Sequence, residues 1–258
     1  MAGGAAIPRL TGMTWTELVM GSAPLKGEQP AVSDVRTGEV LSHAGFARRV
    51  THVAGGLRHF GLKYGDRVLV NLPMGAALPV AVHAVAWAGG IAVLGATGSA
   101  RMMITRGPYD PAAVDVPQVF AVESAPGARP FSDLLGDLTV EFGPLAGPAL
   151  VVGARVFGHD ELAGDLRRLA AKRAMSGDDV VLAAVCDVFK GLRLLDLALT
   201  AGAHVVIAHE PTLIGCRVLA QEHGATVAVA PYELARRLLG EPALRVLDER
   251  AVVSSLTP

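Results

Sequence analysis

The sequence has few cysteines and almost no net charge. Its 258 residues include two cysteines, Cys186 and Cys216, which lie far apart and outside any cluster of histidines. This pattern fits neither a disulfide framework nor a cysteine-based zinc site. A formal net charge of -1 gives no electrostatic reason to expect binding to nucleic acid or to an anionic membrane surface. We therefore expect a protein of the reducing cytoplasm that binds neither.

Sequence motifs of several common enzyme classes are also missing. The chain has no G-x-S-x-G, GKS/GKT or G-x-G-x-x-G pattern, and its eight histidines never occur with a carboxylate at metal-ligand spacing. These absences argue against a standard hydrolase, NTPase or dehydrogenase. We expect no metal site and no bound cofactor.

One long uncharged run, at residues 74–97, is compatible in length with a membrane span, which needs about 20 apolar residues. Pro79, His83 and the Gly89-Gly90 pair divide it into a short helix and a strand. A double glycine near a helix end would leave backbone groups unsatisfied in lipid. We therefore expect a buried helix–strand unit and no membrane span. The N-terminal residues also lack the basic and then apolar pattern of a secretion signal.

Strand-like and helix-like segments alternate along the chain. Ser42 is placed to begin a helix and Gly61 to end it, with apolar residues between them at helical spacing: Phe46, Val50, Val53, Leu57 and Phe60. Continuous apolar strands occur at residues 67–71, 180–185, 204–208 and 226–230. Such strands are typical of parallel sheets buried on both faces. The pattern predicts an α/β doubly wound architecture.

Four segments, in order along the chain, carry a family resemblance. Residues 41–94 contain a helix ending in Gly-Leu, then Gly-Asp-Arg-Val, a strand, a proline turn and a helix closed by Ala-Gly. The other segments are SGDDVVLAAVCDVFKGLRLLDLALTAGAHVVIAHEP (176–211), HGATVAVAPYELARRLL (223–239) and RAVVSSLTP (250–258). Together they resemble the N-terminal domain of acyl-CoA synthetases and other AMP-binding, adenylate-forming ligases.

The resemblance implies two stacked, doubly wound and mostly parallel sheets with flanking helices. We expect the strands of residues 66–122 in one sheet and those of 148–258 in the other, with the helix at 43–60 bridging them. The corresponding subdomains would be 1–147 and 148–258. Because the chain ends where the family continues into its adenine- and ribose-contacting motifs, we also expect the C-terminal ligase domain to be absent.

A further departure from the family lies inside the chain. In the family, a Ser/Thr/Gly-rich loop with a lysine wraps the triphosphate between a strand like PALVV and a helix like HDELAGDLRRLAAKRA. Here ALVVGARVFGHDEL (149–162) runs from strand into helix, with Gly153, Ala154 and Arg155 as nearly all that remains. Charge on the phosphate oxygens needs backbone N–H groups and a cation. We therefore predict that the chain does not adenylate. A helix expected before residues 118–122 is also shortened.

The segment CDVFKGL (186–192) carries the candidate catalytic residues. It follows a strand at its carboxyl end, where α/β sheets place ligands. By resemblance, Asp187 stands near the family's substrate-side histidine, with Lys190 close by. Burial could shift the pKa of either group towards acid–base work at neutral pH. The alternative is that Asp187 caps the next helix and Lys190 is solvated.

The resemblance also implies a pocket for a small acyl or aromatic ligand. Its candidate substrate-binding residues are Phe189, Gly191, Pro231, Tyr232, Ser254 and Ser255. The alternative is that these residues have structural roles only: Tyr232 would be a half-buried tyrosine at the start of a helix, and Ser254 and Ser255 would end a strand.

Three functions remain open on the sequence alone. In the first, the chain is a binding or partner protein without adenylation activity. In the second, it is an ATP-independent enzyme, such as a cyclase, isomerase or hydrolase. In the third, it is half of a split ligase. A mean hydropathy of +0.42 and an unpaired sheet edge near the C-terminus favour association through apolar surface. We expect a homodimer or a complex with a pathway enzyme, which a monodisperse monomer in light scattering would contradict.

Overall fold

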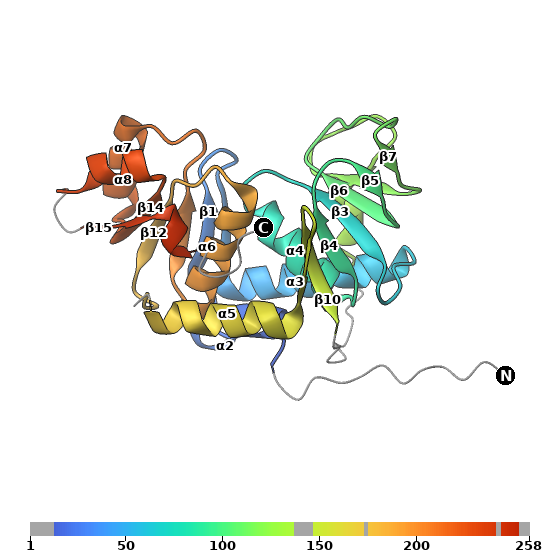
Figure 1. Cartoon of the computed structure of the whole chain (residues 1–258), viewed down its shortest axis with the longest axis horizontal. Helices are drawn as coiled ribbons and strands as arrows, with labels where there is room; N and C mark the ends of the chain where they lie inside the picture. The colour runs from blue at the N-terminus through green and yellow to red at the C-terminus, as the bar shows by residue number, and fades with distance from the viewer. Residues whose placement is uncertain (1–12, 137–146, 173–174, 241–243, 253–258) are drawn as a thin grey trace.

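The computed structural model describes residues 13–136, 147–172, 175–240 and 244–252. Two large sheets lie on opposite sides of a layer of helices (Figure 1). The helices are α1 (Trp15–Met20), α2 (Ala23–Lys26), α3 (His43–His59), α4 (Ala77–Trp87), α5 (His159–Lys172), α6 (Val188–Ala201), α7 (Leu213–His223) and α8 (Tyr232–Leu238), with 3-10 turns η1 (Phe131–Leu134) and η2 (Glu249–Val252). This is the expected mixed α/β architecture of two mostly parallel sheets flanked by helices.

The first sheet has seven strands in the order β11-β10-β4-β3-β6-β8-β9. Their bounds are Arg155–Gly158, Pro148–Val152, Ile91–Leu94, Arg67–Asn71, Met102–Thr105, Val119–Ala121 and Arg129–Pro130. Neighbouring strands are parallel except β10 and β11, which form an antiparallel hairpin. A separate pair, β5 (Gly98–Ser99) and β7 (Val114–Asp115), lies beside this sheet in the connections around β6.

The second sheet has six strands in the order β15-β14-β12-β13-β1-β2. Their bounds are Arg245–Asp248, Val227–Ala230, Val180–Ala183, His204–Ile207, Pro30–Asp34 and Glu39–Ser42. Only β1 and β2 are antiparallel. The central strands β12, β13 and β14 are buried along nearly their whole length, as their continuous apolar sequences predict.

The expected grouping of strands is wrong for β10. Strand β10 pairs with β4 in the first sheet, with Leu150 opposite Ala92, whereas we had expected it in the second. Strand β1, which lies outside both expected ranges, joins the second sheet beside β13, with Val32 opposite Val205. Each sheet therefore takes strands from both sides of residue 148. The hydrophobic pattern predicts that a segment is a strand, but it does not predict which strand lies beside it, because every buried parallel strand has a similar apolar run.

The predicted helix between Ser42 and Gly61 is confirmed. The Ser42 hydroxyl accepts a hydrogen bond from the backbone N–H of Gly45 at 2.9 Å, and Gly61 follows the helix with a φ of 91°. Within α3, a Cβ on Gly56 would lie 2.4 Å from the carbonyl oxygen of Leu134. The glycine therefore permits the close approach of α3 and η1.

The two remaining local expectations have different outcomes. Residues 74–97 form α4 and β4, as predicted, and no helix in the described ranges is long and apolar enough to cross a membrane. Before residues 118–122, the structure has the strand β6 where the family resemblance led us to expect a shortened helix. All four residues of β6 are buried, because β6 lies between β3 and β8 inside the sheet.

The helix layer between the sheets contains a buried polar network. The guanidinium of Arg193 in α6 donates to Asp165 and to Asp196, each at 3.0 Å. Asp196 also accepts from the indole N–H of Trp15 at 2.8 Å and lies 3.0 Å from His83 Nε2. All five side chains belong to residues with no exposed surface. The network thus joins α1, α4, α5 and α6 across the middle of the molecule.

Candidate functional site

The junction at residues 149–162 is a tight β-hairpin. Strand β10 turns at Gly153 and Ala154 into β11, with Val152 paired to Arg155, and α5 begins at His159. Gly153 has a φ of 57°, and two-residue hairpin turns require such positive values. We had expected only a few residues between this strand and the helix, and that expectation missed β11, which lies between them. The connection between the two strands is nevertheless only two residues long.

Arg155, the first residue of β11, lies against its own hairpin and against α5. Its guanidinium stands 4.7 Å from the centre of the Phe157 ring and 3.4 Å from a carboxylate oxygen of Glu161. The side chain is partly exposed. The guanidinium thus has an aromatic ring and a carboxylate beside it.

The candidate catalytic residues lie at the start of α6, and their side chains have separate partners. The carboxylate of Asp187 accepts a hydrogen bond from the backbone N–H of Lys190 at 2.8 Å, so Asp187 caps the helix as the alternative interpretation predicted. The Lys190 ammonium donates to Glu249 at 2.6 Å. This hydrogen bond raises the pKa of Lys190 above its ordinary value. An acid–base role for either residue stays a prediction.

Two of the predicted substrate-binding residues face the protein interior. Phe189 is buried and stacks on Phe157, with ring centroids 5.7 Å apart and planes inclined by 15°. A Cβ on Gly191 would lie 2.0 Å from the sulfur of Met74. The Met74 side chain therefore occupies the space beside Gly191 in this conformation.

The other predicted binding residues lie near the end of β14. Pro231 is the N-cap of α8, and the Tyr232 side chain that follows it is half exposed. The Arg250 guanidinium lies 5.2 Å from the centre of the Tyr232 ring, a distance suited to a cation–π contact. Ser254 and Ser255 lie outside the described residues. The structure thus brings together the loops after β12, β14 and β15, and it adds Glu249 and Arg250 to the candidate set.

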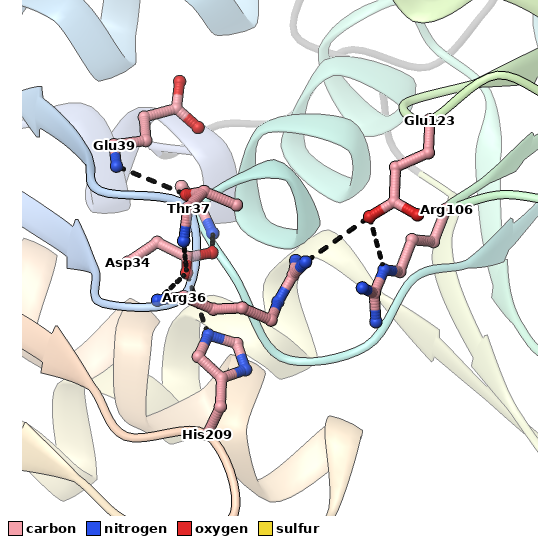
Figure 2. Close-up of polar contacts among 8 residues, drawn as sticks. Asp34, Arg36, Thr37, Glu39, Arg106, Glu123 and His209 are labelled. Carbon is pink, nitrogen blue, oxygen red and sulfur yellow. Dashed lines mark hydrogen bonds and ion pairs between the residues drawn. The ribbon is translucent and has the colours of Figure 1, made fainter.

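A second polar cluster lies where β1 of the second sheet ends (Figure 2). The buried Asp34 carboxylate accepts hydrogen bonds from the backbone N–H groups of Arg36, Thr37 and Ala76 at 3.1, 3.3 and 3.2 Å. Its Oδ1 also lies 2.9 Å from His209 Nε2. Burial alone would raise the pKa of Asp34, but these hydrogen bonds and the charge of His209 together hold it below its ordinary value.

This cluster continues across to the first sheet. One carboxylate oxygen of Glu123 accepts from Arg106 Nε at 2.8 Å and lies 3.4 Å from Arg36 Nη1 (Figure 2). The hydrogen bond from Arg106 is the main cause of a lowered pKa at Glu123. Arg36 comes from the β1–β2 turn, whereas Arg106 and Glu123 follow β6 and β8. The three side chains therefore connect the two sheets at the carboxyl ends of parallel strands.

An open groove of about 450 Å³ lies beside this cluster. Its lining comes from the ends of β3, β6 and β8 and from the start of α6: Asn71, Leu72, Pro73, Thr105, Arg106, Gly107, Pro108, Glu123 and Val188. Val188 directly follows Asp187, so the groove adjoins the candidate residues at the start of α6. Our sequence interpretation missed Asp34, Arg106 and Glu123. The available signal was their position at or just after the carboxyl ends of strands, where α/β sheets bind ligands.

Comparisons with known proteins agree with this fold. Residues 22–100 match the sequence model of the family described as AMP-binding enzyme. A putative long-chain-fatty-acid CoA ligase from Rhodopseudomonas palustris CGA009 superposes with a TM-score of 0.75 at 20% identity, over 92% of this chain and 70% of its own. No protein of curated function matches the sequence.

Two further solved structures are similar over much of this chain. A benzoate CoA ligase from Burkholderia xenovorans LB400 has a TM-score of 0.72 at 20% identity and covers 91% of this chain. MbtA from Mycobacterium smegmatis, with the same TM-score and identity, covers 86%. The match spans 55% and 49% of the lengths of these two proteins. The resemblance is thereby confirmed: residues 22–100 carry the sequence pattern of AMP-binding enzymes, and the chain has the fold of the N-terminal part of adenylate-forming ligases.

Proposed function

We propose that this chain binds a small acyl or aromatic ligand without adenylating it, and that it acts as a binding or partner protein in a biosynthetic pathway. The observation that carries the proposal is the two-residue turn between β10 and β11. A triphosphate needs a row of backbone N–H donors and a cation around its oxygens. A turn of Gly153 and Ala154 offers too short a backbone to surround it.

The charge next to this turn supports the same conclusion. Arg155 is the first residue after the turn, and its guanidinium lies over Phe157 and close to Glu161. A phosphate at this position would have to compete with the Glu161 carboxylate and would meet its negative charge. The strands and helix around the turn are complete, so the fold is retained where the phosphate-binding loop of the family is expected.

The proposal predicts that the purified chain has no carboxylate-dependent pyrophosphate exchange. The assay follows exchange of labelled pyrophosphate into ATP, with fatty and aromatic acids offered in turn. The Burkholderia xenovorans benzoate CoA ligase, supplied with benzoate, is the positive control. We expect the chain to stay at the background rate with every acid. Acid-dependent exchange clearly above that background would refute the loss of adenylation.

An ATP-independent enzyme is the second candidate, because Asp187, Lys190 and Glu249 place three ionisable groups at one sheet edge. Two substitutions separate catalysis from capping. Asp187→Ala removes the cap and is expected to cost about 1 kcal/mol of unfolding free energy, whereas Asp187→Ser retains a capping oxygen. Denaturant titration measures this difference.

The same two substitutions, Asp187→Ala and Asp187→Ser, test the catalytic role of Asp187 in the native host. If Asp187 acts as an acid or base, Asp187→Ser abolishes formation of the pathway product although the protein stays as stable as the parent. An unchanged product profile in the Asp187→Ser strain would rule out that role.

A further inference from the structure

We propose that Arg36 and Arg106 form a binding subsite for the carboxylate of a singly charged organic acid, and that Glu123 occupies this subsite when no ligand is bound. Arg106 and Glu123 of this subsite also line the groove at the carboxyl ends of β3, β6 and β8. The inference rests on the proposed function only for the acyl or aromatic class of the ligand.

The first observation is that two arginine side chains converge on one carboxylate. Arg36 and Arg106 approach the same oxygen of Glu123, although they come from different sheets (Figure 2). Arg106 uses its Nε for this contact, and within the described residues its two terminal nitrogens have no hydrogen-bond partner. Arg106 also lines the 450 Å³ groove. A guanidinium presents its donors in a planar fork that matches a carboxylate.

The local charge selects the type of anion. Arg36, Arg106 and Glu123 together carry a charge of one positive unit, which suits an anion of one negative unit. The other nearby carboxylates are already engaged, since Asp34 pairs with His209 and Glu39 with Arg49. A phosphate group of higher charge would be less well balanced here.

Glu123 is a weak occupant that a ligand can displace. Its side chain is 51% exposed, and those of Arg36 and Arg106 are 32% and 42% exposed. Ion pairs in such a setting contribute little because water screens them. A ligand that adds apolar contacts to the same charge interaction therefore has an advantage over Glu123.

The groove offers those apolar contacts. Leu72, Pro73, Pro108 and Val188 are among its lining residues, and Asn71 and Thr105 add polar side chains to the lining. Its volume of about 450 Å³ lies within the range of small-molecule sites, roughly 300–1,000 Å³. An acid with its carboxylate on the two arginines would lay its body along this groove, towards the start of α6.

The test measures binding of benzoate, hexanoate and octanoate to the purified full chain by isothermal titration calorimetry. We expect at least one acid to bind. Arg106→Gln and Arg36→Gln should each weaken it about tenfold, because each removes charged hydrogen bonds. Glu123→Gln should tighten it about fivefold, because it removes the internal competitor. A purely structural salt bridge would not produce this gain.

Matched controls make the result decisive. Arg48→Gln removes an exposed arginine that pairs with Glu28, and it should leave the affinity unchanged. Benzamide, the neutral analogue of benzoate, should not bind. The subsite is refuted if no acid binds to Glu123→Gln, or if the substitutions at 36, 106 and 123 all leave the affinity unchanged. Inorganic phosphate binding as tightly as the best acid would refute the carboxylate assignment. Pyrophosphate exchange tests the loss of adenylation separately from these affinities.

Discussion

Asp196→Ala is expected to lower the free energy of unfolding by about 3–5 kcal/mol, because it removes one partner of a buried ion pair. The Asp196 carboxylate accepts from Arg193 and from the indole of Trp15, and it lies 3.0 Å from His83. After the substitution, Arg193 retains Asp165 as its counterion, but the fully buried indole N–H of Trp15 loses its acceptor. An unsatisfied buried donor adds its own desolvation cost.

Denaturant unfolding at neutral pH measures this loss, and an exposed pair provides the matched control. Glu28→Ala removes the Arg48 partner on the surface, where both side chains are more than 60% exposed, and should change the unfolding free energy by less than about 1 kcal/mol. Asp196→Asn retains an acceptor oxygen and should fall between the two. A loss below 1 kcal/mol for Asp196→Ala would mean that the network does not hold the helix layer together.

This network also shows what the sequence does not reveal. Asp196 lies within a helix whose apolar residues were readable, but nothing in the local pattern marks a buried carboxylate. Its partners lie on other helices, and Trp15 is 181 residues away. Buried charge depends on tertiary pairing, which one sequence does not show.

The fold could be predicted further than the site. Apolar runs located the strands β3, β12, β13 and β14, and the caps located α3, because those signals are local. The grouping of β10 failed because strand partners are set by packing. The β10–β11 hairpin was missed because Arg155–Gly158 is only four residues long and continues into the amphipathic pattern of α5.

In the candidate site, too, contacts between neighbours in sequence could be predicted and contacts between distant residues could not. Asp187 and its helix cap are adjacent in sequence, so the capping alternative was readable. Glu249 reaches Lys190 from 59 residues away, and Glu123 reaches Arg36 from 87 residues away. Such pairs follow from how the sheets order their strands, and the sequence did not predict that order.

His159→Leu is expected to make the stability of the protein less sensitive to acid. His159 is 3% exposed, and this burial lowers its pKa from 6.5 to about 4. Nearby Asp160 opposes the shift and His83 adds to it. Between these pH values the unfolded chain binds a proton that the folded protein does not. The neutral imidazole therefore favours folding above pH 6.5, and this advantage is lost as the pH falls towards 4.

The expected loss of unfolding free energy follows from the lowered pKa of His159. One pKa unit corresponds to about 1.4 kcal/mol, so His159 should account for a loss of about 3 kcal/mol between pH 6.5 and 4. Denaturant titrations at several pH values measure the slope. His159→Leu should flatten it by this amount, while His59→Gln on the exposed end of α3 should leave it unchanged. A residual slope is expected, because burial also lowers the pKa values of His43 and His204. If His159→Leu and the parent lose stability equally over this range, burial does not lower the pKa of His159.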